Sequence, residues 1–114
     1  MDSMNLALKI CKAASNKKAA GIITMDMRSV MFSTDYFVIC HAPTATQVRA
    51  IADNIEEELE AEKIFLGHKE GYHEGEWVLL DYGDVVAHIF KAENREYYAL
   101  EKLWGDVETV KYED

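Results

Sequence analysis

The sequence contains little proline, glycine and cysteine, and each shortage narrows the kinds of protein it can encode. One proline and six glycines among 114 residues exclude a linker-rich or disordered chain, and 49% hydrophobic residues are typical of a globular protein. We therefore expect a single domain over residues 1–114, long enough to bury its own core. Cys11 and Cys40 lie far apart in apolar segments, which favours buried thiols of a reducing compartment over a disulfide or a metal pair.

Positive charge is also scarce. Twelve Lys and Arg residues against 21 Asp and Glu residues give a formal net charge of −9. Such a surface repels phosphate backbones and attracts basic proteins, so we expect no specific binding to nucleic acid. No apolar run has the length of a membrane span, and no basic and then apolar leader opens the chain. These absences predict a soluble cytoplasmic protein.

What the chain does have is a predicted β-hairpin, around which the rest is organised. Residues 77–80 and 85–90 are apolar runs of strand length, and Gly83 between them can adopt the positive φ of a tight turn. Both faces of this hairpin are largely apolar, so helices cover one face, and the other is covered by more of the chain or by a partner. Alternation assigns to one face Trp77, Leu79 and Asp81, and to the other Val78, Leu80 and Tyr82.

The remaining pattern predicts an α/β fold, with a mixed five-stranded sheet packed by helices. Thr44 and Gln47 have the spacing of a capping box at the start of the second helix, and Asn94 is placed to cap the third. The expected helices cover about residues 3–16 and 95–104, with another that starts at Thr44; the expected strands cover residues 20–25, 36–40, 77–80 and 85–90, with weaker candidates at 63–66 and 107–112.

Motifs of catalysis and cofactor binding are absent from the sequence. No nucleophile elbow, zinc signature or dinucleotide fingerprint occurs, and the glycines at 67, 71 and 75 precede no helix, so they do not form a phosphate loop. The histidines lack the spacing of a helical metal site; they are His41, His68, His73 and His88. We therefore predict no catalytic residue, metal or cofactor.

Several residues allow two interpretations. His88 lies mid-strand among apolar residues. It is either a half-buried histidine whose hydrogen bonds are satisfied within the fold or a residue that contacts a partner. Asp81 and Asp84 flank the turn, where carboxylates bond to backbone N–H groups, although a catalytic pair is the alternative. Trp77 is expected to lie near these acids. It is either a core residue or the anchor of an interface with acidic residues around it. The acidic face of the second helix is either solvated or a docking surface.

The hairpin and the third helix carry a resemblance to a known family. The run W-x-L-x-D-Y-G-D-V-V-x-H-x-F over residues 77–90, followed by R-x-x-Y-x-L-E-x-L-W over residues 95–104, resembles the ribosomal silencing factor (RsfS/Iojap) family. The segment TDYFVI at residues 34–39 and the helix after it are similar to the first half of the same family, so the resemblance covers nearly the whole chain.

The resemblance implies a function and a partner. It implies a non-enzymatic translation repressor that binds a basic L14-type protein of the large ribosomal subunit and sterically blocks joining of the subunits under nutrient limitation. The implied fold has a nucleotidyltransferase-like topology, but the paired Asp-x-Asp catalytic motif is missing. The alternative is a nucleotide- or metal-dependent enzyme of that fold. An apolar patch that awaits a partner can also pair with a second copy, so a homodimer of the free protein stays open.

Together, the resemblance and the sequence pattern select the residues expected to bind the partner. Aromatic and aliphatic side chains would bury against the ribosomal protein, and carboxylates would pair with its Lys or Arg residues. The predicted set is Trp77, Leu79, Asp81, Tyr82, Asp84, Tyr98, Glu101 and Leu103.

Overall fold

The chain folds into one six-stranded mixed sheet with helices on both faces. A computed structural model describes residues 2–98 and 100–113, with the side chains at 96–98 and 101 outside the description. The elements in chain order are α1 (Ser3–Asn16), β1 (Ala20–Asp26), β2 (Tyr36–Ala42), α2 (Ala45–Ala61), β3 (His68–Glu70), β4 (Trp77–Asp81), β5 (Val85–Lys91), α3 (Ala92–Tyr98), α4 (Leu100–Leu103) and β6 (Thr109–Lys111).

The strands are arranged in the order β3-β4-β5-β2-β1-β6. The central strands β2 and β5 run parallel, in register from Tyr36 opposite Val85 to Ala42 opposite Lys91, and the described pairs to either side are antiparallel. Nearly every residue of β2 and β5 is buried. The solid apolar run at residues 36–40 is therefore a central strand covered on both faces, as its composition predicts.

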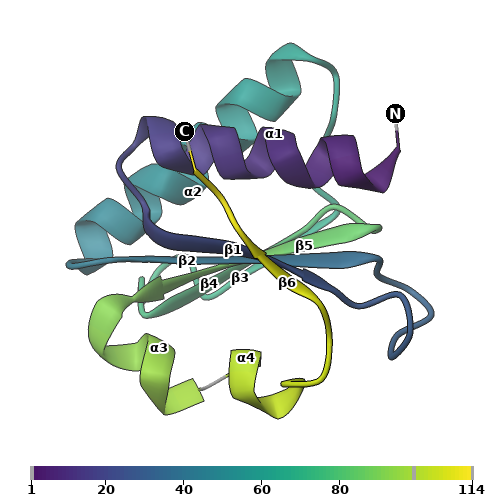
Figure 1. Cartoon of the computed structure of the whole chain (residues 1–114). Helices are drawn as coiled ribbons and strands as arrows, with labels where there is room; N and C mark the ends of the chain where they lie inside the picture. Colours follow the sequence, from purple (N-terminus) through teal and green to yellow (C-terminus); the bar gives the residue numbers. More distant parts are fainter. Residues whose placement is uncertain (1, 99, 114) are drawn as a thin grey trace.

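The sheet separates two hydrophobic clusters. Figure 1 shows α1 and α2 on one face and the shorter α3 and α4 on the other. The cluster under α1 and α2 joins Ile10 and Ile55 of these helices to Val78 and Leu80 of β4. The cluster on the opposite face includes Met25, Met27, Phe37, Ile39, Val86 and Phe90.

Local side-chain chemistry defines where the two long helices begin. The Asp2 carboxylate accepts a hydrogen bond of 2.8 Å from the Asn5 backbone N–H, and the Thr44 hydroxyl accepts one of 3.1 Å from the Gln47 N–H. The predicted cap at Thr44 is confirmed. The expected return contact of the Gln47 amide is not made, because the amide donates to the Lys17 carbonyl oxygen at 3.4 Å and so ties α2 to the end of α1.

Three expectations about the elements were wrong. The sheet has six strands, not five, because both β3 and β6 pair with its edges. The strand expected at residues 63–66 is β3 at His68–Glu70; residues 64 and 66 lie in a connection and pack on the core, which explains their strand-like alternation. Asn94 does not cap α3, which begins at Ala92 directly after β5, so Asn94 lies inside its first turn.

Among the described residues, no helix is both long enough and apolar enough to cross a bilayer.

Candidate partner-binding site

The hairpin at the centre of the candidate site has the predicted antiparallel pairing, with Trp77 opposite Phe90. Gly83 has φ of +86°, and a Cβ there would contact nothing, so the turn needs glycine for its backbone conformation alone. The Asp81 carboxylate accepts a hydrogen bond of 2.7 Å from the Gly83 N–H. Turn chemistry therefore accounts for Asp81, as one of the two sequence interpretations predicted.

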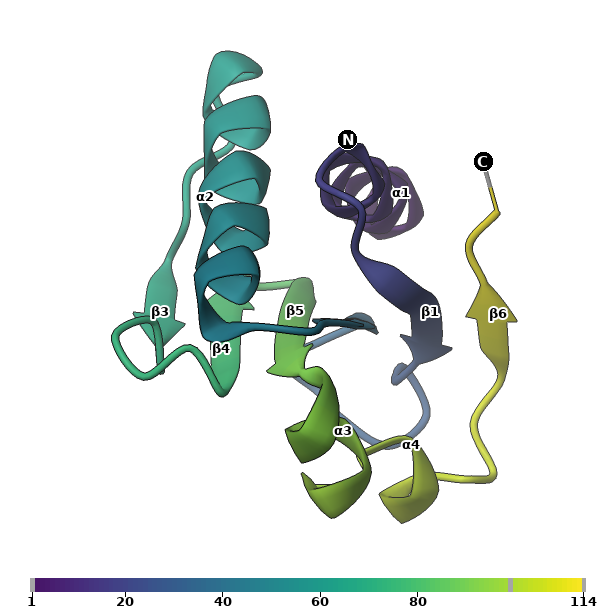
Figure 2. The same cartoon turned by 90° about the vertical axis from the view of Figure 1, so that its left-hand side faces the viewer.

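The two faces of β4 have different surroundings. Val78 and Leu80 are fully buried, whereas Trp77, Leu79 and Asp81 on the other face are only half-buried. Figure 2 shows the cause: α2 lies over β3 and β4 on one side of the sheet, and α3 and α4 lie on the other side nearer β5 and β1. No helix of the described residues covers the part of the sheet formed by β3 and β4 on the Trp77 side.

Strand β3 widens this exposed area. Its pairing sets His68 opposite Asp81 and Glu70 opposite Leu79, and residues opposite one another in a ladder share a face. His68 and Glu70 are exposed, and the His68 Nε2 atom lies 2.8 Å from a carboxylate oxygen of Glu70. We call the surface formed by Trp77, Leu79, Asp81, His68 and Glu70 the open face.

His68 and Glu70 were not predicted as site residues. The only signal in the sequence was the charged segment His-Lys-Glu at residues 68–70, whose alternate side chains would point to opposite faces of a strand. In the structure Lys69 points away from the open face and pairs with Glu56 of α2 at 2.9 Å. Sequence alone gave no way to recognise this segment as the edge strand beside β4.

Trp77 belongs to both the surface and the core. Its indole Nε1 donates a hydrogen bond of 3.1 Å to Nδ1 of His88, and its ring stacks on Phe90 with centroids 5.2 Å apart. His88 is buried, with 4% of its surface exposed, and this burial lowers its pKa to about 4. The imidazole is therefore neutral at neutral pH and holds Trp77 from below.

The structure does not bring all the predicted site residues together. Tyr82 lies on the opposite face against the α1–α2 cluster, where burial and the nearby carboxylates of Glu56 and Glu60 raise its pKa. Asp84 is exposed at the turn, and its carbonyl oxygen accepts a 2.7 Å hydrogen bond from the Asp35 N–H. Leu103 of α4 is 68% exposed. The predictions for Tyr98 and Glu101 concern side chains outside the described residues.

The acidic face of α2 is occupied largely by contacts within the chain. Asp53 accepts a hydrogen bond from the Tyr72 hydroxyl at 2.9 Å, Glu58 accepts from Asn16 at 3.0 Å, and Glu62 pairs with Lys9. These partners attach the helix to α1 and to the segment around β3.

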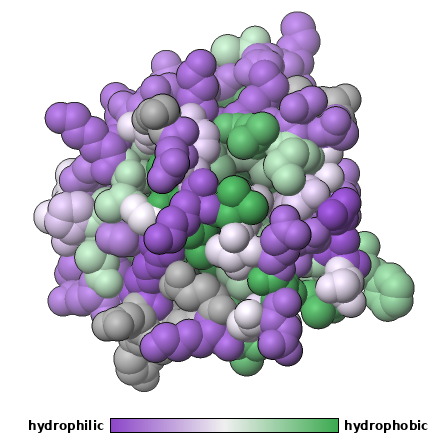
Figure 3. Space-filling view, viewed as in Figure 1, coloured by the Kyte–Doolittle hydropathy of each residue, from purple (hydrophilic) through white to green (hydrophobic). Residues whose placement is uncertain are grey.

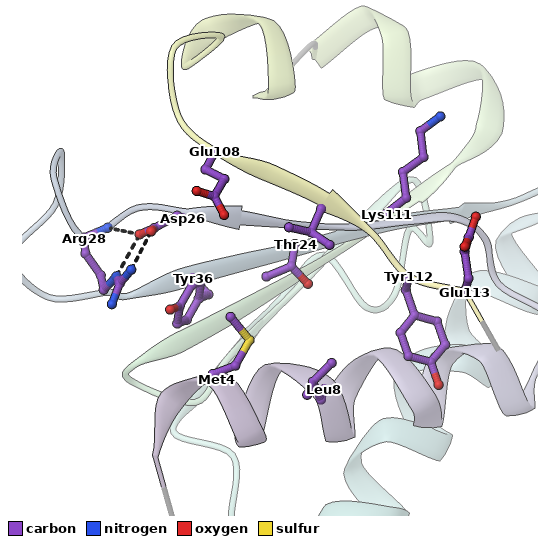
Figure 4. Close-up of a pocket in the computed structure, with 11 residues that line it drawn as sticks. Met4, Leu8, Thr24, Asp26, Arg28, Tyr36, Glu108, Lys111, Tyr112 and Glu113 are labelled. Atoms are coloured by element: carbon purple, nitrogen blue, oxygen red, sulfur yellow. Dashed lines mark hydrogen bonds and ion pairs between the residues drawn. The ribbon is translucent and has the colours of Figure 1, made fainter.

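Another concave surface lies between α1 and β6, away from the open face. It has a volume of about 430 Å³, and Figure 4 shows Met4 and Leu8 of α1 facing Tyr112 across it, with the Asp26–Arg28 ion pair at one end. In the space-filling view of this side, apolar patches near the meeting of α1 and β6 are framed by hydrophilic surface (Figure 3). Of the predicted partner-binding residues whose side chains the structure describes, none lines this groove.

His41, at the end of a central strand, has a structural contact. The Arg95 guanidinium of α3 lies 2.7 Å from Nδ1 of His41 and donates a hydrogen bond of 2.7 Å to the Gly21 carbonyl oxygen. This contact fastens α3 to β1 and β2. Within the described part of the chain, no group of three His, Cys, Asp or Glu side chains is arranged to hold a metal ion.

The fold is that of a small α/β protein, and an open sheet face with a hydrogen-bonded, half-buried aromatic residue and carboxylates around it is the kind of surface that proteins use to bind a partner protein. The family model described as "Ribosomal silencing factor during starvation" matches residues 1–114. The chain therefore belongs to the ribosomal silencing factor family, whose members are non-enzymatic, ribosome-binding regulators of translation. The resemblance seen in the sequence is confirmed.

Similar proteins support this assignment over nearly the full chain. Ribosomal silencing factor RsfS of Bacillus subtilis is 46% identical over 100 residues, covering 87% of this chain and 85% of the relative. RsfS of Halalkalibacterium halodurans is 39% identical over 113 residues, covering 99% and 97%. A crystal structure of a Chromobacterium violaceum protein superposes with a TM-score of 0.89 at 30% identity, covering 92% of this chain and 88% of that one. The six-stranded α/β fold is thus the fold of known relatives.

Proposed function

We propose that the open face binds a basic L14-type protein of the large ribosomal subunit and that the bound chain sterically prevents the small subunit from joining. The observation that carries this proposal is Trp77, which the fold holds half-exposed on an uncovered sheet face beside carboxylates. A fixed aromatic side chain among charged neighbours is typical of the centre of a protein interface.

Charge supports the choice of a basic partner. The chain has a net charge of −9, and Asp81 and Glu70 lie on the open face, with Asp84 at the adjoining turn. A partner rich in Lys and Arg would be steered to this end of the molecule at ordinary ionic strength.

The proposed roles follow from position. Trp77 and Leu79 bury against the partner, Asp81 and Asp84 pair with its cations, and Leu103 extends the apolar contact from α4. Tyr98 and Glu101 of the third helical region join them in the proposal. Tyr82 supports the hairpin from the opposite face and reaches the partner only if the contact wraps around the turn.

The experiment is a binding measurement on isolated large subunits and on the purified L14-type protein. Trp77→Ala should weaken binding by about 2 kcal/mol, or roughly thirtyfold, as truncation of a central anchor does. Val110→Ala serves as the control, since Val110 is 54% exposed on β6 at the far edge of the sheet. With both variants folded by circular dichroism, equal affinities would reject the open face as the docking site.

Three further points belong to this proposal. We place the protein in the cytoplasm, where a factor that silences ribosomes meets them.

A homodimer of the free protein would cover the same apolar residues, so sedimentation should show the partner and the second copy competing. The fold is proposed to share the topology of nucleotidyltransferases without their catalytic motif.

A further inference from the structure

Trp77 is held by contacts to two residues of the neighbouring strand. Phe90, its direct partner in the ladder, stacks on the indole at an interplanar angle of 26°. His88 is two residues away from Phe90 on the same face, and its Nδ1 accepts the indole N–H at 3.1 Å. The ring is therefore fixed both by stacking and by a directional hydrogen bond.

The chemistry of the two rings decides which imidazole nitrogen carries the proton. An indole N–H can only donate, so Nδ1 of His88 must be the acceptor, and the proton of the neutral imidazole is on Nε2. Burial lowers the pKa of His88 to about 4, so this neutral form is the one present at neutral pH.

The other nitrogen of His88 makes this arrangement costly. Nε2 is buried and has no hydrogen-bond partner among the described residues, and the centroid of the Phe37 ring lies 4.5 Å from that of the imidazole. A buried donor without an acceptor lowers stability, and an apolar side chain would avoid the loss. The contact with Trp77 is what a histidine provides here and an aliphatic residue cannot.

We propose that His88 is the positioning residue of the open face: it engages the indole N–H, so that Trp77 presents to the partner a fixed aromatic surface without a hydrogen-bond donor. This inference rests on the proposed function and specifies the chemistry that the site recognises. The matching group on the partner is an alkyl chain or the cation of Arg or Lys placed against the ring, because both interact with carbon surface and π-electrons. A backbone carbonyl of the partner would not be recognised through the indole N–H, because that N–H already donates to His88.

Three substitutions of His88 separate positioning from simple support of the fold. Asparagine places its side-chain oxygen close to where Nδ1 is, so His88→Asn keeps an acceptor for the indole. His88→Leu fills the site without an acceptor. His88→Gln carries the same amide as Asn but extends it toward the Nε2 position, and it replaces the Leu variant if that variant does not fold.

Two measurements are made on each variant. The chain has two tryptophans, so a ¹H–¹⁵N spectrum contains two indole signals, and Trp104 serves as the internal reference for Trp77. Affinity is measured for isolated large ribosomal subunits. We expect His88→Leu to accelerate solvent exchange of the Trp77 indole proton, leave that of Trp104 unchanged, and weaken binding roughly fivefold, because the side chain must then be immobilised on binding. His88→Asn should stay within about twofold of the unaltered chain.

The outcomes also separate this inference from the proposed function. If Trp77→Ala weakens binding but His88→Leu and His88→Asn have the same affinity, the positioning role is wrong and the open face stands. If Trp77→Ala binds large subunits with the same affinity as the unaltered chain, the open face is not the docking site. The proposed role of His88 in positioning Trp77 for a partner is then wrong as well. Faster indole exchange in the Leu variant, together with recovery of affinity in the Asn variant, supports the inference.

Discussion

The buried histidine under Trp77 predicts a specific loss of stability in mild acid. His88 has a pKa of about 4 in the folded chain against an ordinary value of 6.5, because burial disfavours the charged imidazole. As the pH falls below 6.5, the unfolded chain takes up a proton that the folded chain does not. Stability present above pH 6.5 is therefore lost progressively as the pH falls toward about 4.

The size of the effect follows from the two pKa values. Lowering the pH from 7 to 5 should reduce the free energy of unfolding by about 2 kcal/mol, and the full difference between the two states is roughly 3 kcal/mol. Carboxylates contribute little in this interval because they titrate mainly below pH 5. The interval from pH 7 to pH 5 is therefore the range of histidine titration, and comparison with His88→Leu isolates the contribution of His88.

The assay is urea unfolding at pH 7 and pH 5, followed by tryptophan fluorescence, on the unaltered chain, His88→Leu and His73→Gln. His73 is exposed, so its variant is the control and should keep the pH dependence of the unaltered chain. His88→Leu should lose about 2 kcal/mol less than the unaltered chain over the same interval. An equal loss in the His88→Leu variant would refute the assignment of the acid sensitivity to His88.

Further predictions concern the turn, the cap and the glycines. Asp81→Asn keeps an acceptor for the Gly83 N–H but removes the charge, so binding to large subunits should weaken at low salt, and the difference should disappear at high salt. Thr44→Ala should cost about 1 kcal/mol of unfolding free energy in urea, and Thr46→Ala in the first turn of α2 much less. Gly83→Ala should cost about 1–2 kcal/mol from its positive φ alone. Gly71→Ala should cost clearly more, because its Cβ would also meet the backbone carbonyl of Trp77; equal losses in thermal unfolding would contradict this.

Much of the local structure could be predicted from the sequence. The start of α1 and of α2, the hairpin with Gly83 at its turn, and the assignment of Trp77 and Val78 to opposite faces were all confirmed. Each depends on residues within a few positions of one another, where capping, turn conformation and side-chain alternation act. The motif over residues 77–104 was also sufficient to indicate the family, which the family model then confirmed.

Apart from the Asn94 cap, the errors and the unpredicted residues depend on longer-range contacts. Whether β3 pairs with β4, and hence whether His68 and Glu70 lie beside Trp77, depends on how the connection after α2 packs on the core. The prediction that Tyr82 is an anchor assumed that the whole hairpin is accessible to a partner. In the structure α2 covers the face of the hairpin on which Tyr82 lies.

The sequence by itself determined the two long helices, the hairpin, the acidic charge and the family, because short-range chemistry and composition are enough for these. Only the tertiary structure decided which face of β4 stays uncovered and that His88 receives the indole N–H of Trp77. The physical reason is that a face is exposed or buried according to where distant helices pack, and alternation along one strand carries no information about that packing.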